Sequence, residues 1–258
     1  MPFSDHKAIG DWQALFGINL RCPHLSWYTM EGEAKRDFPA SFIHHSTWWD
    51  SYDTVERYYA RIGLLLGQGS PACDVLILNP VESVWCQVHE GWAHWLDSGE
   101  PWSRALMQSY VKVFEWLSGA QIDFDYGDEE MLSRLAAVET KGGRPRIRVG
   151  QARYRMILVP RMTTMRSSTL RLLKRFHAAG GTVLFAEAPA AFVDAVPSDE
   201  VEKFALLCRR LSAFDSDQLV RAVDGVLGGS AVRVTGTRGA PVGQVFAQMR
   251  RADGMDVV

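Results

Sequence analysis

Hydrophobic positions from residue 72 onwards follow two spacings, one typical of buried strands and one typical of amphipathic helices. Continuous apolar runs such as ACDVLILNP indicate strands covered on both faces, and apolar residues at intervals of three and four indicate helices. The predicted strands are 72–80, 121–126, 146–149, 153–159 and 182–189. The predicted helices are 101–118, 128–138 and 167–179. This alternation predicts an α/β fold with a doubly wound, mostly parallel sheet.

The ends of the predicted strands share a turn-forming character. They carry the sequences NP, YG, VP and EAP. Ligands of open α/β sheets bind outside the carboxyl ends of the strands. These four ends therefore mark where a ligand of this sheet would lie, although the fold alone does not identify it.

The segments on either side of this sheet have different patterns. Residues 15–22 predict a short buried strand, which leads into a long aromatic loop and a helix over 54–68. After the sheet, residues 198–227 predict two helices that begin at the caps Ser198 and Asp215/Ser216. The tail, residues 230–258, predicts three short strands, and we expect its apolar end to lead into a further β domain.

Bulk composition excludes several classes of protein. The chain has 258 residues, 47% of them hydrophobic and 22% charged, which disfavours disorder, collagen and coiled coil. A net charge of -2 disfavours nucleic acid and membrane surfaces as partners. No apolar run reaches the ~18 residues of a membrane span. The four cysteines form no C-x-x-C pair, and with a polar N-terminus they favour a cytoplasmic location.

All nine tryptophans and six of the seven histidines lie in the first half of the chain, many of them in one loop. Loops longer than about 15 residues inside a compact domain are commonly functional. Aromatic faces stack on sugars, and charged groups bind their hydroxyls, so this mixture predicts a carbohydrate site. The alternative is a surface loop whose aromatics pack on a neighbouring domain. The candidate substrate-binding residues of the loop are His24, Trp27, Tyr28, Glu33, Arg36, Asp37, His44, His45, Trp48 and Trp49, with Glu31 as the candidate catalytic residue.

Glu82 and Trp85 follow the first strand of the sheet, and we include them among the candidate substrate-binding residues. The alternative is a capping glutamate and a packed tryptophan. No metal site is predicted, because no H-x-x-x-H or H-E-x-x-H motif occurs and the adjacent His44 and His45 would point in opposite directions in an extended loop.

Other chemistries lack their motifs. No G-x-C-x-G elbow supports amidotransferase catalysis, and neither G-x-x-x-x-G-K-[ST] nor G-x-G-x-x-G supports nucleotide binding, so we expect no cofactor. Residues 141–175 contain eleven lysines and arginines and no acid. Their apolar pattern favours a solvated face or an interdomain surface over nucleic-acid binding, and an electrostatic contact between subunits is the other alternative.

Three segments carry a family resemblance. SWYTMEGEAKRDFP, WWDSYDTVERYYARIGLLLGQG and DVLILNPVESVW resemble bacterial glycoside hydrolases of the α-L-rhamnosidase-like type, family 106. The stretch RYRMILVPRMTTMRSSTLRLLKRFHAAGGTVLFAE is similar to the domain that follows the barrel in those enzymes, and to the amidotransferase-like trimerisation domain of family 42 β-galactosidases. The resemblance covers roughly residues 10–258.

The resemblance implies a division into three parts. Residues 1–70 would be the C-terminal remnant of a (β/α)8 barrel, residues 71–197 a flavodoxin-like or class I amidotransferase-like domain, and residues 198–258 helices and the start of a β domain. The principal catalytic carboxylates would then precede Met1. The implied function is carbohydrate metabolism by hydrolysis of a glycosidic bond, a rhamnoside or a galactoside, with this fragment alone inactive. The alternatives are a non-catalytic module that forms homo-oligomers or binds carbohydrate, and an unrelated flavodoxin-like ligand binder.

Overall fold

A computed structural model describes residues 2–23, 29, 31–33, 43–91, 100–239, 242–243 and 245–258. Its contacts divide the chain into two units. We name residues 1–71 and 250–258 the helical unit, and residues 72–249 the sheet unit. Residues 198–249 belong to the sheet unit, and residues 250–258 belong to the helical unit.

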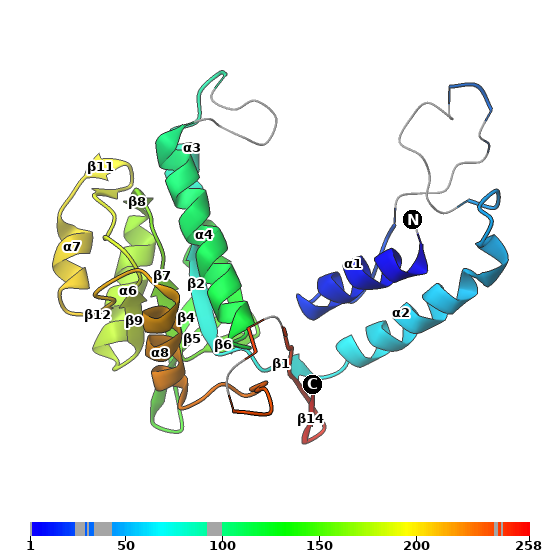
Figure 1. Cartoon of the computed structure of the whole chain (residues 1–258). Helices are drawn as coiled ribbons and strands as arrows, with labels where there is room; N and C mark the ends of the chain where they lie inside the picture. The colour runs from blue at the N-terminus through cyan, green and yellow to red at the C-terminus, as the bar shows by residue number, and fades with distance from the viewer. Residues whose placement is uncertain are drawn as a thin grey trace. The chain divides into compact units, whose positions relative to one another are not determined.

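A five-stranded parallel sheet forms the centre of the sheet unit, which confirms the predicted α/β class (Figure 1). The strands run in the spatial order β12-β9-β7-β2-β3. Their bounds are β2 Val75–Asn79, β3 Phe124–Asp128, β7 Met156–Val159, β9 Thr182–Phe185 and β12 Arg209–Arg210. Each neighbouring pair is parallel. The first strand therefore lies inside the sheet, between the second and the third.

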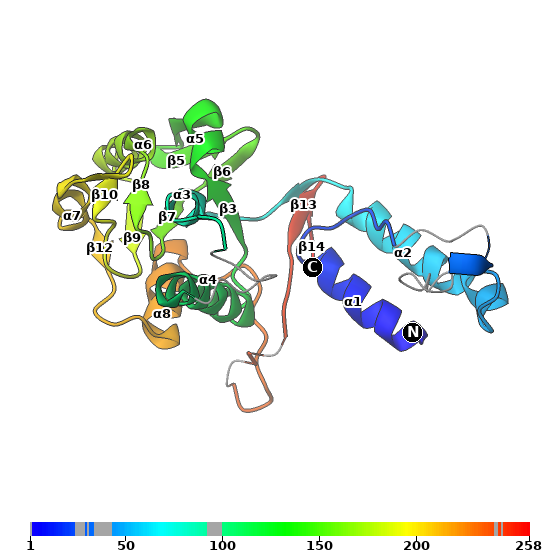
Figure 2. The ribbon, with the colours of Figure 1, turned by 90° about the horizontal axis from the view of Figure 1, so that it is seen from above.

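Helices cover both faces of this sheet. Figure 2 shows α4 (Pro101–Gly119) and α8 (Ser216–Leu227) on one side of it, and α5 (Glu129–Leu135) and α6 (Ser167–Ala178) on the other. Side chains of a strand alternate between its faces. Leu76 and Leu78 accordingly join the core beneath α6, while Val75 and Ile77 join the core beneath α4 and α8. The near-continuous apolar strands of the sequence follow from this burial on both faces.

Shorter elements complete the sheet unit. The helix α3 (Val81–Trp85) follows β2, and α7 (Glu200–Ala205) packs its Val201 and Phe204 in the same core as α6. An antiparallel sheet consists of β4 Ala136–Lys141, β5 Arg144–Val149 and β6 Ala152–Tyr154. A second small sheet consists of β8 Thr164–Met165, β10 Phe192–Val193 and β11 Val196–Pro197.

In the described part of the helical unit there are two α-helices, one short 3-10 helix and one small sheet. The helices are α1 (Phe3–Leu15) and α2 (Asp53–Leu66), with the short 3-10 helix η2 (Trp49–Ser51) before α2. The antiparallel sheet pairs β1 (Ser70–Pro71) with β13 (Arg250–Ala252), and β13 with β14 (Met255–Val257). The strand β13, near the end of the chain, therefore pairs with β1, a short distance after α2.

Three sequence predictions are wrong in detail. Residues 15–22 form no strand, because α1 occupies the chain up to Leu15 and irregular structure follows. The helix predicted over 128–138 ends at Leu135, where β4 begins. In the described part of the tail, two of the three expected strands are present, β13 and β14.

Within the described residues, every helix is too short or too polar to cross a membrane.

Candidate functional site

The order of the parallel strands places a crevice at one edge of the sheet. From β2 the chain passes first to β3 on one side and then to β7 on the other. The connections that follow β2 and β7 therefore diverge, and ligands of open α/β sheets bind where the strand order reverses in this way. Here that position lies beyond Asn79 and Val159, the last residues of β2 and β7.

A cavity of about 280 Å³ lies next to this edge. Its wall consists of the first turns of α4, the connection after β7 and the connection after β9. The lining residues are Trp102, Ala105, Leu106, Arg161, Met162, Thr163, Glu187, Ala188, Pro189 and Ala191. We call it the strand-end cavity. Two of the four strand ends noted in the sequence, VP and EAP, thus lead directly into its wall.

Glu187 provides the fixed charge of the strand-end cavity. Its side chain is 14% exposed, its Oε1 accepts a hydrogen bond from Ser109 Oγ of α4, and its Oε2 lies 3.4 Å from Arg161 Nη1. A carboxylate with a hydroxyl donor on one oxygen and a guanidinium on the other is held in one orientation. Arg161 is 52% exposed, so most of its five donors remain available to a ligand.

Ser83 fixes the connection after β7. Its Oγ accepts hydrogen bonds from the backbone N–H groups of Thr163 (2.9 Å) and Thr164 (3.2 Å), and donates one to the carbonyl of Thr164 (3.2 Å). The side chain of Gln87 adds a contact to Thr163 Oγ1 at 3.5 Å. The short helix α3 thus sets the position of Arg161 and Thr163 in the cavity wall. Sequence reasoning selected Glu82 and Trp85 of the same segment and missed Ser83.

Glu82 belongs to a buried ionic cluster. Arg166 Nε donates to its Oε1 at 2.6 Å, and the backbone N–H of Arg166 donates to Glu129 Oε2 at 2.9 Å. Glu129 is fully buried, and this burial raises its pKa to about 7, with a smaller contribution from the nearby charge of Glu82. The two carboxyl groups are enclosed and partnered by Arg166. They are therefore suited to holding α3, α5 and α6 together, and poorly placed to reach a substrate.

The alternative interpretation of this segment, a capping glutamate and a packed tryptophan, is wrong for Trp85. Trp85 is 66% exposed and is not a packed core residue. Glu82 lies in the first turn of α3, but the interaction that fixes its side chain is the ion pair with Arg166. Neither residue lines the strand-end cavity.

The predicted site residues of the aromatic loop fall into two groups. His24, Trp27, Tyr28, Arg36 and Asp37 lie outside the described residues. The others, Glu31, Glu33, His44, His45, Trp48 and Trp49, are described and belong to the helical unit, whereas Glu82 and Trp85 belong to the sheet unit.

Glu31 is exposed, and its backbone N–H donates to Thr29 Oγ1 at 3.1 Å. The rings of His44 and His45 lie with their centroids 4.0 Å apart, so the prediction that they point in opposite directions is wrong. These residues form a turn and not an extended segment, which brings the two side chains to one side. No group of three metal-ligating side chains occurs among the described residues.

Trp48 serves the packing of the helical unit. Its ring lies 5.5 Å from Phe3 and 5.7 Å from His6 of α1, and 5.5 Å from Tyr52 (centroid distances). Trp49 is stacked with Tyr52 at 6.1 Å and is more exposed. Trp48 therefore joins α1 to the start of α2, which is a structural role, and Trp49 remains accessible for binding.

Comparison with known protein families and with curated proteins finds no match to this chain.

Proposed function

We propose that the sheet unit binds carbohydrate, as a non-catalytic module of a glycoside-hydrolase-like protein. The strand-end cavity is the observation that carries this proposal. Its wall combines a half-buried aromatic side chain, Trp102, with the oriented carboxylate of Glu187 and the exposed guanidinium of Arg161. The spatial strand order, second-first-third-fourth-fifth along the chain, is that of flavodoxin-like sheets, whose ligands bind at this edge.

Each part of the wall supplies one element of sugar recognition. The indole of Trp102 offers an apolar surface to the C–H face of a pyranose. Glu187 accepts hydrogen bonds from hydroxyl groups, and Arg161 donates them. Ser109 and Ser83 position these groups and need not touch the sugar. A volume of about 280 Å³ suits one or two sugar rings.

Binding is better supported than hydrolysis at this cavity. Glycosidases need a pair of carboxyl groups on either side of the scissile bond. Among the described residues that line the cavity, Glu187 is the one acidic residue. The carboxyl groups of Glu82 and Glu129 are buried and engaged by Arg166. A hydrolytic centre of the whole protein would therefore involve residues outside this cavity.

Titration calorimetry of the full chain with L-rhamnose, D-galactose and their methyl glycosides tests this proposal. We expect Trp102→Ala to weaken binding about tenfold through the lost stacking surface. We expect Glu187→Gln to weaken it by about 10- to 100-fold, since hydrogen bonds to charged groups contribute about 1.5–3 kcal/mol. Trp85→Ala is the matched control, because it removes an exposed tryptophan outside the cavity. Equal losses in Trp85→Ala, or no binding of any sugar, would reject the proposal.

Hydrolysis of a glycosidic bond by the glycoside-hydrolase-like protein is a separate proposal, with Glu31 of the aromatic loop as the candidate catalytic carboxyl group. A panel of aryl glycosides tests it by comparing the chain with its Glu31→Gln variant. Loss of turnover in the variant supports Glu31, and unchanged turnover removes it from the mechanism. Sugar binding without turnover by either chain supports the module.

A homo-oligomer is the second candidate function of the sheet unit. Leu206 and Leu207 are both exposed large apolar side chains, and Cys208 alone separates them from the edge strand β12. Adjacent exposed leucines favour a contact with another protein surface. Light scattering of the chain and of a Leu206→Asp/Leu207→Asp variant tests this: a change from oligomer to monomer supports the contact, and a monomeric parent chain rejects it. The four unpaired cysteines support a cytoplasmic location.

A further inference from the structure

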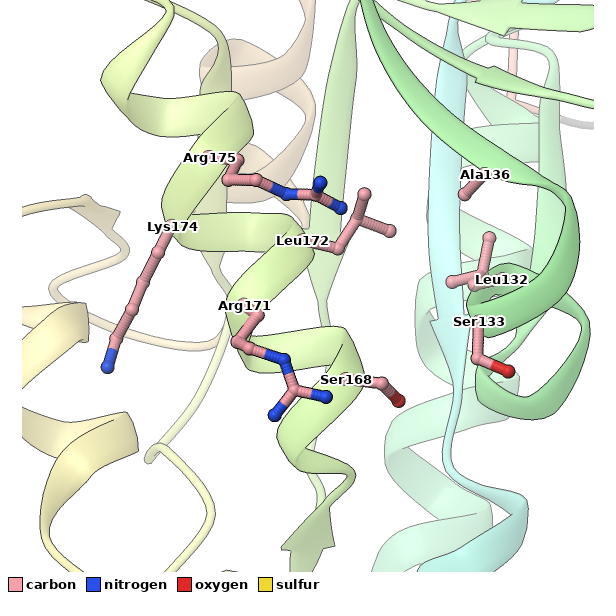
Figure 3. Close-up of a pocket in the computed structure, with 8 residues that line it drawn as sticks. All are labelled: Leu132, Ser133, Ala136, Ser168, Arg171, Leu172, Lys174 and Arg175. Carbon is pink, nitrogen blue, oxygen red and sulfur yellow. The ribbon is translucent and has the colours of Figure 1, made fainter.

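A second cavity lies on the side of the sheet unit that α5 and α6 cover, and it is lined by none of the residues of the strand-end cavity. Its volume is about 490 Å³. We call it the α5–α6 groove; Figure 3 shows its lining residues, which are Leu132, Ser133, Ala136, Ser168, Arg171, Leu172, Lys174 and Arg175. Its base is apolar and its rim on α6 is basic.

The basic rim contains two cations of the run 141–175, Arg171 and Arg175, for which the described residues provide no ion-pair partner. Counting partners among the described residues, six of the eleven cations form salt bridges with acids from outside the run. Lys174 is one of them, with its Nζ 2.9 Å from Glu200. Arg171 and Arg175 form no salt bridge with another described residue. Their spacing of four places both on one face of α6, where like charges repel each other in the absence of an anion.

The directions of the side chains agree with this division. Figure 3 shows the guanidinium of Arg175 extending from α6 across the groove toward the side of Leu132 and Ala136, and that of Arg171 extending toward Ser168. Lys174 points away from the groove on the other flank of the helix. The groove therefore contains two guanidinium groups without an ion-pair partner in the described part of the chain, and Lys174, the third cation of its lining, is paired with Glu200.

We propose that the α5–α6 groove binds a phosphate monoester. A phosphate monoester carries close to two negative charges at neutral pH, which matches the two unpaired guanidinium groups, whereas one carboxylate supplies a single charge. Guanidinium groups bind phosphate oxygens in pairs of parallel hydrogen bonds. The hydroxyl of Ser168 adds a neutral donor beside Arg171. Leu132, Leu172 and Ala136 offer an apolar surface to the organic part of the ester.

This site is independent of the proposed carbohydrate cavity. The segment 141–175 contains no phosphate-binding sequence motif. The α5–α6 groove instead consists of side chains on one face of α6 and of the apolar residues on the other side of the groove. The volume of about 490 Å³ exceeds what inorganic phosphate fills. We therefore expect an ester with a small apolar body to bind more tightly than the inorganic ion.

Titration calorimetry of the full chain with phenyl phosphate tests the proposal, with inorganic phosphate and benzoate as comparison ligands. We expect phenyl phosphate to bind at least about fivefold more tightly than either. Arg171→Gln and Arg175→Gln should each weaken its binding about tenfold or more. Lys174→Gln is the matched control: it removes the same charge from the same helix, and it should change binding less than twofold because Lys174 is already paired.

Three results would overturn the proposal. They are no binding of phenyl phosphate, an equal loss in Lys174→Gln, and equal affinity for benzoate. The second would mean that the net charge of the surface attracts the ligand, and the third would mean a site for organic anions in general. Thermal unfolding of each variant shows whether it is folded, and both arginines are exposed, so we expect folded proteins.

Discussion

Glu129→Gln should remove a pH-dependent destabilisation from the sheet unit. Glu129 is fully buried at the start of α5, directly after β3. Its Oε2 accepts the backbone N–H of Arg166, and its Oε1 is buried without a hydrogen-bond partner among the described residues. Burial is the main cause that raises the pKa of this carboxyl group to about 7, from an ordinary value of 4.5.

The sign of the effect follows from proton linkage. Between pH 4.5 and about pH 7 the folded protein retains a proton on Glu129 that the unfolded chain has released. The free energy of unfolding therefore falls as the pH rises through this window. A difference of about 2.5 pKa units corresponds to a loss of about 3 kcal/mol between pH 4.5 and pH 8. Glutamine remains neutral at both ends of the range, so this part of the pH dependence disappears.

Urea unfolding of both proteins at pH 5, 6, 7 and 8 provides the measurement. The fall in the free energy of unfolding from pH 5 to pH 8 should be smaller in Glu129→Gln by about 2–3 kcal/mol. Glu130→Gln is the matched control, one residue further along α5, where the carboxylate is exposed and paired with Arg134. Its profile should parallel that of the parent chain. Parallel profiles for Glu129→Gln and the parent chain would refute the assignment of this titration to Glu129.

Two further predictions concern single residues that hold later segments of the chain in place, Gln121 in the sheet unit and Gly69 in the helical unit. The side chain of Gln121 accepts a hydrogen bond from the backbone N–H of Val234 at 3.0 Å and donates one to the carbonyl of Val245 at 2.6 Å. Gln121→Ala removes both bonds and should lower the stability of this segment by about 1–3 kcal/mol. Hydrogen exchange around Val234 should accelerate accordingly. Gly69 has a φ of +57°, and an added Cβ would lie 2.0 Å from the carbonyl oxygen of Arg251. Gly69→Ala should therefore detach β13 from β1. Faster proteolysis after Arg251 checks this expectation, and an unchanged cleavage rate contradicts it.

The parallel sheet was predictable because its signals are local. The strand β2 is a continuous apolar run, and α6 repeats Leu170, Leu173 and Phe176 on its buried face. Asp215 caps α8, as its position predicts, by accepting the backbone N–H of Gln218 at 2.9 Å. These elements carry their own start and stop signals, and each buries the face that its spacing defines.

The sequence predictions were wrong where tertiary contacts, and not the local spacing of apolar residues, determine the secondary structure. The buried face of α1 consists of His6, Gly10 and Ala14, a spacing of four that an apolar pattern does not show. Leu15 to Cys22 contains a more apolar run, which predicted a strand that the chain does not form. The end of α5 depends on a distant partner, because Ala136 to Lys141 pairs with β5 and so leaves the helix. Such pairing is not encoded in the spacing of the segment itself.

The strand-end cavity was predictable in place but not in composition. The strand ends VP and EAP were visible in the sequence, and the second of them contains Glu187. Its partner Ser109 precedes it by 78 residues on α4, and Arg161 follows a different strand. A sequence shows which residues end a strand, but the helix residue that faces them depends on how α4 packs across the sheet.

The basic run shows why charge along the sequence differs from charge on the surface. Read in order, residues 141–175 are a block of positive charge, yet five acids outside the run pair with six of its cations. Glu139 pairs with both Arg148 and Arg153, and Asp74, Glu187, Glu82 and Glu200 pair with one cation each. A uniform basic face for nucleic acid is thereby reduced to isolated positions. Because Arg171 and Arg175 are adjacent on one helix face, their remaining charge is concentrated at one apolar groove, which favours a compact anion over a polymer.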